Sequence, residues 1–286
     1  MPLSPHPNPT YHLAYITALP SELTAALTLL DTLHGIPQSQ PAEDPNAYIL
    51  GAIGPHNIVM VCLPAGRMGT AAAATVGENL RRTFPGVKYA VLVGIGGGVP
   101  RYTEGAESDI RLGDVVVGVP SGGYGGIVSY DCEGRVQLDS PPQKLLGCVT
   151  MVNCLMGSAR GKRRGEVLGG FWRSWGRGCL ACGDAGGEIY RKERTSTLPV
   201  VHVGTIASGN TVIGDGVTRD RICERYKGSV LCFEMEAAGL VNCLPCLVVR
   251  GISDYADAHK NDEWRPRAIA AAIDSTRMRS IDSLAR

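Results

Sequence analysis

The sequence lacks an excess of charge of either sign. Its 286 residues include 28 Lys and Arg against 27 Asp and Glu, which gives a formal net charge of +1. Proteins that bind nucleic acids or anionic membranes usually carry a marked basic excess, so neither partner is expected here. Charged residues make up only 19% of the chain and hydrophobic residues 44%, a composition that can bury a large core and excludes a disordered chain.

Long apolar runs are also missing. No stretch approaches the roughly eighteen apolar residues that a membrane-spanning helix needs. The proline-rich start, MPLSPHPNPT, has no charged segment followed by an apolar run, so no signal peptide is expected. Cys62, Cys232 and Cys246, three of the ten cysteines, lie in apolar segments, which favours reduced, buried thiols over disulfides. These features together predict a cytoplasmic protein.

Apolar segments of strand length alternate along the chain with segments of helical spacing. Several strands are apolar throughout, as is typical of strands covered on both faces. The pattern predicts one α/β domain over residues 1–286, a three-layer sandwich whose central mixed, mostly parallel twisted sheet is flanked by helices. The expected strands are 11–19, 48–52, 57–63, 89–94, 115–119, 200–208, 230–236 and 246–252, and the expected helices are 23–33, 70–84, 143–156, 215–226, 237–242 and 266–284. A glycine loop is expected at 94–98.

Residues 157–194 differ from the rest of the chain. They are rich in Gly and Arg, include Trp172 and Trp175 and show no clean period, which predicts an irregular surface excursion. Cys179 and Cys182 have zinc-like spacing, but a tetrahedral zinc site needs four ligands and no second pair follows at a recognised distance. Neither a metal nor a cofactor is therefore expected.

Acidic residues follow three of the expected strands. Asp254 comes directly after CLVVRGIS, Glu236 lies in LCFEMEAAG, and Glu22 opens the helix after the first strand. Sheets of this class bind ligands at the carboxyl ends of their strands, so these carboxylates are expected to converge on one pocket. Each also has a structural alternative, since Asp254 could cap a turn and the two glutamates could sit in the first turn of a helix.

Three segments in the second half of the chain resemble the purine nucleoside phosphorylase and methylthioadenosine/S-adenosylhomocysteine nucleosidase superfamily. They are IASGNTVI at 206–213, FEMEAAG at 233–239 and VVRGISDYAD at 248–257. ITALPSEL, GRMGTAAAA and VGIGGGV extend the likeness over most of the chain apart from 157–194. CFEMEAAGL and GISDYADAHKN are similar to the fungal form of this domain, which often begins NLR-like immune receptors. The resemblance implies a nucleoside phosphorylase-like fold.

The resemblance also implies roles for the residues that match the family's motifs. Asp254 matches the general acid that protonates purine N7, with Ser253 orienting its carboxylate. Glu236 matches the residue that binds the ribose 2′- and 3′-hydroxyls, Glu234 is a candidate to share this task, and Met235 is expected to pack against the sugar. A proton on N7 makes the purine a better leaving group when the N-glycosidic bond breaks.

Further matches concern the attacking water and the base. Glu22 matches the glutamate that activates water in the hydrolytic branch, and Gly96 and Ile95 belong to the glycine loop beneath the sugar. Val212 and Ile213 match positions that line the base pocket. The family often has an aromatic residue at the first of these, so Val212 removes a stacking surface.

The chain departs from the phosphorolytic members where they bind phosphate. Those relatives have a serine or threonine and an arginine at the positions of Ile95 and Leu92, although Arg67 or Arg101 could still reach the site. The departure favours a purine nucleosidase, with a phosphate-dependent phosphorylase and an NLR-associated sensing module as alternatives. A purine nucleoside or nucleotide is the expected substrate, and a homo-oligomer is expected because family members commonly form oligomers.

Overall fold

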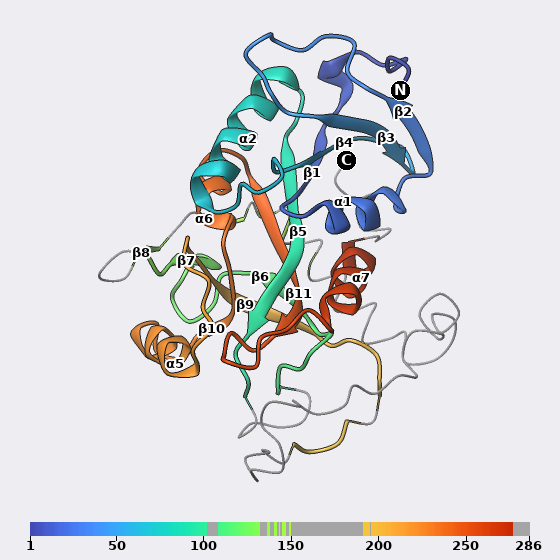
Figure 1. Ribbon diagram of the computed structural model, residues 1–286. Helices are drawn as coiled ribbons and strands as arrows, with labels where there is room; N and C mark the ends of the chain where they lie inside the picture. Colours follow the sequence, from blue (N-terminus) through green and yellow to red (C-terminus); the bar gives the residue numbers. More distant parts are fainter. Residues whose placement is uncertain are drawn as a thin grey trace.

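The computed structural model describes most of the chain, and all structural statements concern these residues (Figure 1). The described residues are 1–101, 108–131, 136–137, 140–141, 143, 145–146, 149, 191–194 and 196–276. Most of the expected helix 143–156, most of the excursion 157–194 with its two cysteines and two tryptophans, and residues 277–284 of the expected last helix lie outside them.

Strands and helices alternate from the first strand to the last helix. The strands are β1 (Leu13–Thr17), β2 (Thr32–Gly35), β3 (Tyr48–Ile53), β4 (His56–Cys62), β5 (Tyr89–Gly98), β6 (Val115–Gly118), β7 (Ile127–Ser129), β8 (Val136–Gln137), β9 (Val201–Ser208), β10 (Val230–Glu234) and β11 (Cys246–Asp254). The helices are η1 (Asn8–Thr10), α1 (Pro20–Leu27), α2 (Thr70–Thr83), α5 (Gly216–Arg225), α6 (Ala237–Leu240) and α7 (Arg265–Thr276). None of these helices is long and apolar enough to cross a bilayer.

The described strands form one mixed sheet that closes on itself. β1 pairs in parallel with β4 and β5, and β5 pairs in parallel with β11. From β11 the pairing continues through β6 and β9 to β10, and β10 returns to pair antiparallel with β5. The expectation of a mixed sheet is met. The ring of strands is a feature that a three-layer sandwich does not include.

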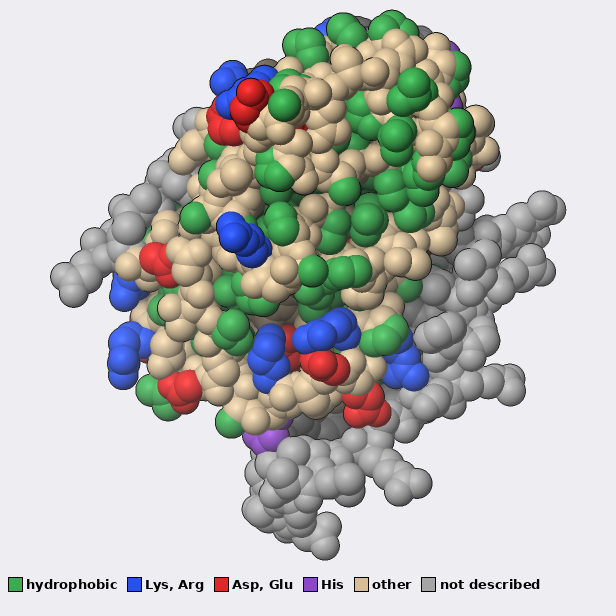
Figure 2. Space-filling model, turned by 45° about the horizontal axis from the view of Figure 1, so that its top comes forward, with side chains coloured by type: hydrophobic (Ala, Val, Ile, Leu, Met, Phe, Trp, Pro, Cys, Tyr) green, Lys and Arg blue, Asp and Glu red, His purple; other side chains and the backbone are tan. Residues whose placement is uncertain are grey.

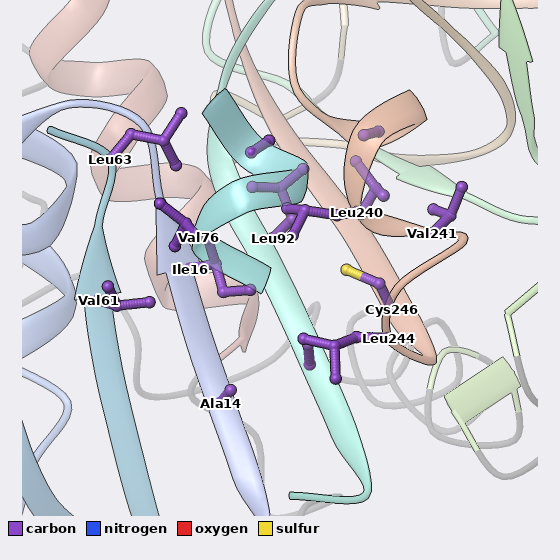
Figure 3. Close-up of a cluster of buried hydrophobic side chains, with 14 of the residues drawn as sticks. Ala14, Ile16, Val61, Leu63, Val76, Leu92, Leu240, Val241, Leu244 and Cys246 are labelled. Carbon is purple, nitrogen blue, oxygen red and sulfur yellow. The ribbon is translucent and has the colours of Figure 1, made fainter. Parts of the chain in front are cut away.

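Helices cover both faces of the strands, and the core divides accordingly. Ala14 and Ile16 of β1 pack with α2 and α6 on one face, whereas Leu13 and Tyr15 pack with α1 and α7 on the other. The alternation follows from the two-residue period of a strand, which points successive side chains to opposite faces. Figure 3 shows part of the first cluster, where Val76 of α2 and Leu240 of α6 lie against the sheet.

Two local expectations were wrong. The helix expected over 23–33 ends at Leu27, because Thr32–Gly35 forms β2 and pairs antiparallel with β3. The loop expected at 94–98 is the end of β5, where Gly97 and Gly98 pair with β10. A Cβ on Gly96 would lie 2.9 Å from the Phe233 carbonyl oxygen, so glycine here permits close packing of strands. In both segments tertiary strand pairing outweighed local pattern.

Parallel pairing places the ends of three strands at one edge of the sheet. β1, β5 and β11 run in the same direction, so the turn into α1, Ile95 in the last part of β5 and Asp254 at the end of β11 lie together. β10 runs antiparallel to β5 and pairs with its last residues. Glu234 is therefore brought to the same edge from another direction.

The close packing of α7 on β11 predicts that Gly251→Ala destabilises the protein. A Cβ at Gly251 would overlap the carbonyl oxygen of Ala268 in α7. Overpacking of a core typically costs about 1–3 kcal/mol, so we expect a lower Tm in thermal unfolding. Gly214→Ala is the matched control, because nothing lies within 4 Å of a Cβ there. A Tm equal to that of the wild type in both variants would contradict the packing described.

Candidate active site

A cavity of about 200 Å³ lies at the edge where these strands end. All ten residues proposed from the sequence line it: Glu22, Ile95, Gly96, Val212, Ile213, Glu234, Met235, Glu236, Ser253 and Asp254. Residues that the sequence did not suggest also line it, among them Tyr130, Phe233, Arg250, Lys260 and Arg265. The expected convergence of acidic residues therefore occurs, whereas the chemical role of each residue remains a proposal.

Glu22 is held in the cavity by three backbone N–H groups. It lies in the first turn of α1 and is buried, with one carboxylate oxygen accepting hydrogen bonds from Ala18 (3.0 Å) and Leu19 (2.9 Å) and the other from Ile95 (2.9 Å). Its bond to Leu19 is that of a helix-capping glutamate, so the structural alternative is present beside the proposed one. Burial raises the pKa of Glu22, and the positive charge of Arg250 opposes only part of that rise.

Arg250 is the buried cation among the glutamates, and sequence reasoning missed it. Its side chain is 1% exposed and forms ion pairs with Glu234 and with Glu236, the latter at 3.4 Å. It also donates a hydrogen bond of 3.3 Å to the carbonyl of Ile95. One signal was available, since an arginine inside the apolar strand Cys246–Asp254 is buried only when it is paired.

Glu234 ends β10 and Glu236 lies two residues further on, and the two carboxylates accept different numbers of hydrogen bonds. Glu234 accepts hydrogen bonds from the backbone N–H groups of Glu236 (3.1 Å) and Ala237 (3.0 Å) in addition to its pair with Arg250. Glu236 accepts one backbone hydrogen bond, from Gly69 at 3.2 Å. Burial raises the pKa of Glu236, Arg250 opposes the rise and Glu234 adds to it. Glu236 thus keeps more acceptor capacity for a ligand.

Asp254 accepts hydrogen bonds from three donors at the end of β11. Ser253 Oγ donates to Oδ2 at 2.8 Å, as expected, and the Ala256 N–H donates to Oδ1 at 2.9 Å. Lys260 Nζ forms an ion pair with Oδ2 at 2.8 Å, a contact that the sequence did not suggest. Ala256 has φ of 50°, in the left-handed region that a residue with a Cβ seldom adopts. Such strain is common at functional sites.

Two aromatic side chains to which the sequence analysis assigned no role enter the cavity. Tyr130 and Phe233 both line it, and their rings pack edge to face with centroids 5.6 Å apart. The Tyr130 hydroxyl lies 3.0 Å from the carbonyl oxygen of Gly209 and 2.6 Å from that of Thr211. These contacts fix the segment before Val212, which is itself 55% exposed. An aromatic surface is therefore present although Val212 provides none.

The cations considered for phosphate binding lie elsewhere. Neither Arg67 nor Arg101 is among the described residues that line the cavity, and Arg101 donates to the carbonyl of Gly228 at 2.7 Å. Leu92 is fully buried in the core. No group of three or more His, Cys, Asp or Glu side chains suited to a metal ion occurs within the described parts of the chain.

A mixed sheet with helices on both faces and an acidic cavity at its strand ends defines the class, that of nucleoside phosphorylase-like domains. The chain belongs to the phosphorylase superfamily, whose family model matches residues 12–284. Its solved neighbours include the methylthioadenosine/S-adenosylhomocysteine nucleosidase of Neisseria meningitidis (TM-score 0.67, 16% identity, 95% of this chain and 99% of that one). The futalosine hydrolase of Helicobacter pylori is another (TM-score 0.65, 15% identity, 96% and 98%). At such identities the likeness shows the fold.

Curated relatives are much longer than this chain. An NLR-like protein of the fungus Hyaloscypha variabilis is 39% identical over 289 residues, which cover 92% of this chain and 28% of the relative. An 80-residue stretch, 26% of this chain, is 38% identical to the ATP nucleosidase Cap17 of Escherichia coli and covers 16% of it. The family prediction, including the likeness to fungal NLR-like proteins, is thereby confirmed.

The raised pKa of Glu22 predicts a pH-dependent effect of Glu22→Gln on stability. A raised pKa means that the folded protein binds this proton more tightly than the unfolded chain does. The wild type therefore loses this stabilisation as the pH rises through the pKa of the folded state, whereas the variant has no carboxyl group to ionise. We expect the free energy of unfolding, variant minus wild type, to increase between about pH 5 and about pH 8 in denaturant titrations.

The exposed Glu263 provides the control for this experiment. Glu263→Gln should give a difference from the wild type that stays nearly constant over the same pH range. A constant difference for Glu22→Gln as well would show that burial does not disfavour the ionised carboxylate.

Proposed function

We propose that this chain hydrolyses the N-glycosidic bond of a purine nucleoside or nucleotide. The observation that carries the proposal is that Asp254, Glu22 and Glu236, which come from separate elements, line the same cavity. Cleavage of this bond needs a proton for the departing base, stabilisation of a positively charged sugar, and an activated water molecule. The three carboxylates offer one group for each need.

Asp254 is the proposed acid. Protonation of N7 lets the purine leave as a neutral base when it takes the electron pair of the C–N bond. Ser253 and the N–H of Ala256 fix the carboxyl group at the cavity wall, and the rings of Tyr130 and Phe233 supply an apolar surface for the base. General acids placed in this way typically contribute about 10²–10⁴-fold to the rate.

Glu236 and Glu22 are proposed to act on the sugar and the water. Glu236 retains acceptor capacity for two hydroxyl groups, and its charge faces the positive charge that develops on the ribose. Glu22 is proposed to take a proton from the attacking water. A carboxylate with a raised pKa suits this task, because a base is most effective when its pKa lies near the working pH.

The surroundings of Ile95 favour water over phosphate as the nucleophile. Glu22 binds the N–H of Ile95, and Glu236 and Glu234 lie around Arg250 nearby. A phosphate ion beside Ile95 would meet several carboxylates, and Arg250, which contacts the Ile95 carbonyl, is already paired with two glutamates. Hydrolysis is therefore the better-supported reaction, and phosphorolysis is the alternative.

The curated relatives bear on the substrate and the setting. The match to a protein named ATP nucleosidase supports a nucleotide, and ATP in particular, as a substrate to test. The match to an NLR-like protein of which this chain spans 28% supports a role as the enzymatic or sensing module of an immune receptor.

A product assay with and without phosphate tests the reaction type. Purine nucleosides and their 5′-phosphates are incubated with the protein, and free base, ribose products and ribose 1-phosphate products are separated by chromatography. We expect free base and no ribose 1-phosphate, with a rate that added phosphate leaves unchanged. A rate that rises with phosphate, together with ribose 1-phosphate products, would support the phosphorylase instead.

Asp254→Asn tests the acid. The amide has nearly the same shape but no acidic proton, so we expect kcat to fall by about 10²–10⁴-fold while Tm changes little. Asp274→Asn, on α7 outside the cavity, is the matched control and should keep full activity. A fully active Asp254→Asn protein would reject Asp254 as the acid.

A further inference from the structure

Lys260 lies against the proposed acid, and no role has been assigned to it above, although it falls within the segment GISDYADAHKN. It follows β11 in the chain and lines the cavity, and its Nζ is 2.8 Å from Oδ2 of Asp254. The Lys260 side chain is 38% exposed, whereas that of Asp254 is 5% exposed. A buried carboxylate is thus paired with a lysine that reaches in from the surface.

This pairing holds Asp254 in the form that cannot act as an acid. An ion pair with Lys260 requires the ionised carboxylate, and the hydrogen bonds from Ser253 and Ala256 stabilise the same form. Transfer of a proton to N7 requires the protonated carboxyl group. Lys260 also occupies a lone pair of Oδ2 and lies within the cavity, where it competes with the base. Catalysis therefore requires Lys260 to leave Asp254.

The cavity contains another cation, Arg265, that would help to bind an anionic group beside Lys260. The cations among the described lining residues are Arg250, Lys260 and Arg265. Arg250 already forms ion pairs with two buried glutamates. Arg265 pairs with Asp262, whose side chain is 71% exposed, and ion pairs of this kind are weak. Figure 2 shows Lys and Arg side chains beside acidic ones at the lower centre of the face, with further charged groups at its upper left and along its left edge. An anionic group at the cavity would find both Lys260 and Arg265 available.

We propose that Lys260 is a latch on Asp254 which an anionic group of the substrate releases. This inference rests on the proposed function and narrows its substrate class to purine nucleosides that carry phosphate. The phosphate takes Lys260 as its counterion, and Asp254 then gains a proton from solvent. Asp254 gives that proton to N7 as the C–N bond breaks with its electron pair going to the base. Water adds to the sugar carbon and loses a proton to Glu22. Lys260 takes no part in the proton transfers and acts through Asp254, so it is a positioning residue.

The first test compares nucleotide and nucleoside cleavage in Lys260 variants. With adenosine, AMP and ATP as probes, the wild type should show a higher kcat/KM for the nucleotides. In Lys260→Met this preference should fall by about tenfold to hundredfold, the value of one charge-assisted hydrogen bond. Lys260→Arg should retain most of the preference. Lys88→Met is the matched control, because Lys88 is exposed, directly precedes β5 and is not among the residues that line the cavity.

The second readout is the pH profile of adenosine cleavage. Lys260 is the cation in contact with Asp254, so its removal should move the alkaline limb of kcat/KM to higher pH. A residue that merely maintained the fold would not move this limb. The charged groups that line the same cavity and must be unchanged in the comparison are Glu22, Glu234, Glu236, Arg250 and Arg265. Lys260→Gln repeats the neutral substitution if Lys260→Met is poorly folded.

The outcomes separate the latch from the proposed function. Cleavage with an unchanged nucleotide preference and an unchanged pH limb in both neutral variants would overturn the latch and leave the enzymatic proposal intact. If the wild type cleaves none of the probes, calorimetric binding decides. Tighter binding of AMP than adenosine that disappears in Lys260→Met would support recognition of phosphate by Lys260. Equal binding of AMP by wild type and variant would overturn it.

Discussion

The site depends on one buried guanidinium balancing three carboxylates. Arg250 pairs with Glu234 and Glu236 and lies close enough to Glu22 to affect its ionisation. Burial raises the pKa of Glu22 and of Glu236, and the single positive charge of Arg250 opposes only part of each rise. The backbone accommodates this cluster at Gly94, where a Cβ would lie 2.6 Å from both Arg250 and Glu22. A larger residue at position 94 would push Arg250 and Glu22 apart and leave buried charges without their partner.

The same imbalance gives the cavity its chemical character. The excess of negative charge around Arg250 favours a sugar on which positive charge develops. The closed ring of strands makes the arrangement possible, since it brings the end of β10 beside β5 and β11. A further ion pair, with Lys260, gives Asp254 a cation of its own.

Much of the fold and of the site could be predicted from the sequence, but two short strands and several cavity residues could not. Long elements such as β11 and α2 were placed within a few residues, because a continuous apolar run and an alanine-rich amphipathic segment are strong local signals. The strands β2 and β7 were not predicted, since four and three residues give no readable period. Tyr130 directly follows β7 and was missed with it, and Lys260 was missed because its role depends on the path of a loop.

The sequence by itself determined most of the strands and helices and the acidic residues at the strand ends, because propensity and periodicity act between neighbours in the chain. Family motifs added the expectation that Asp254, Glu22 and Glu236 belong together. Only the tertiary structure decided which charge pairs with which. Arg250 meets its glutamates and Lys260 meets Asp254 through space, and ionisation in a buried cavity depends on those distances and on the exclusion of water.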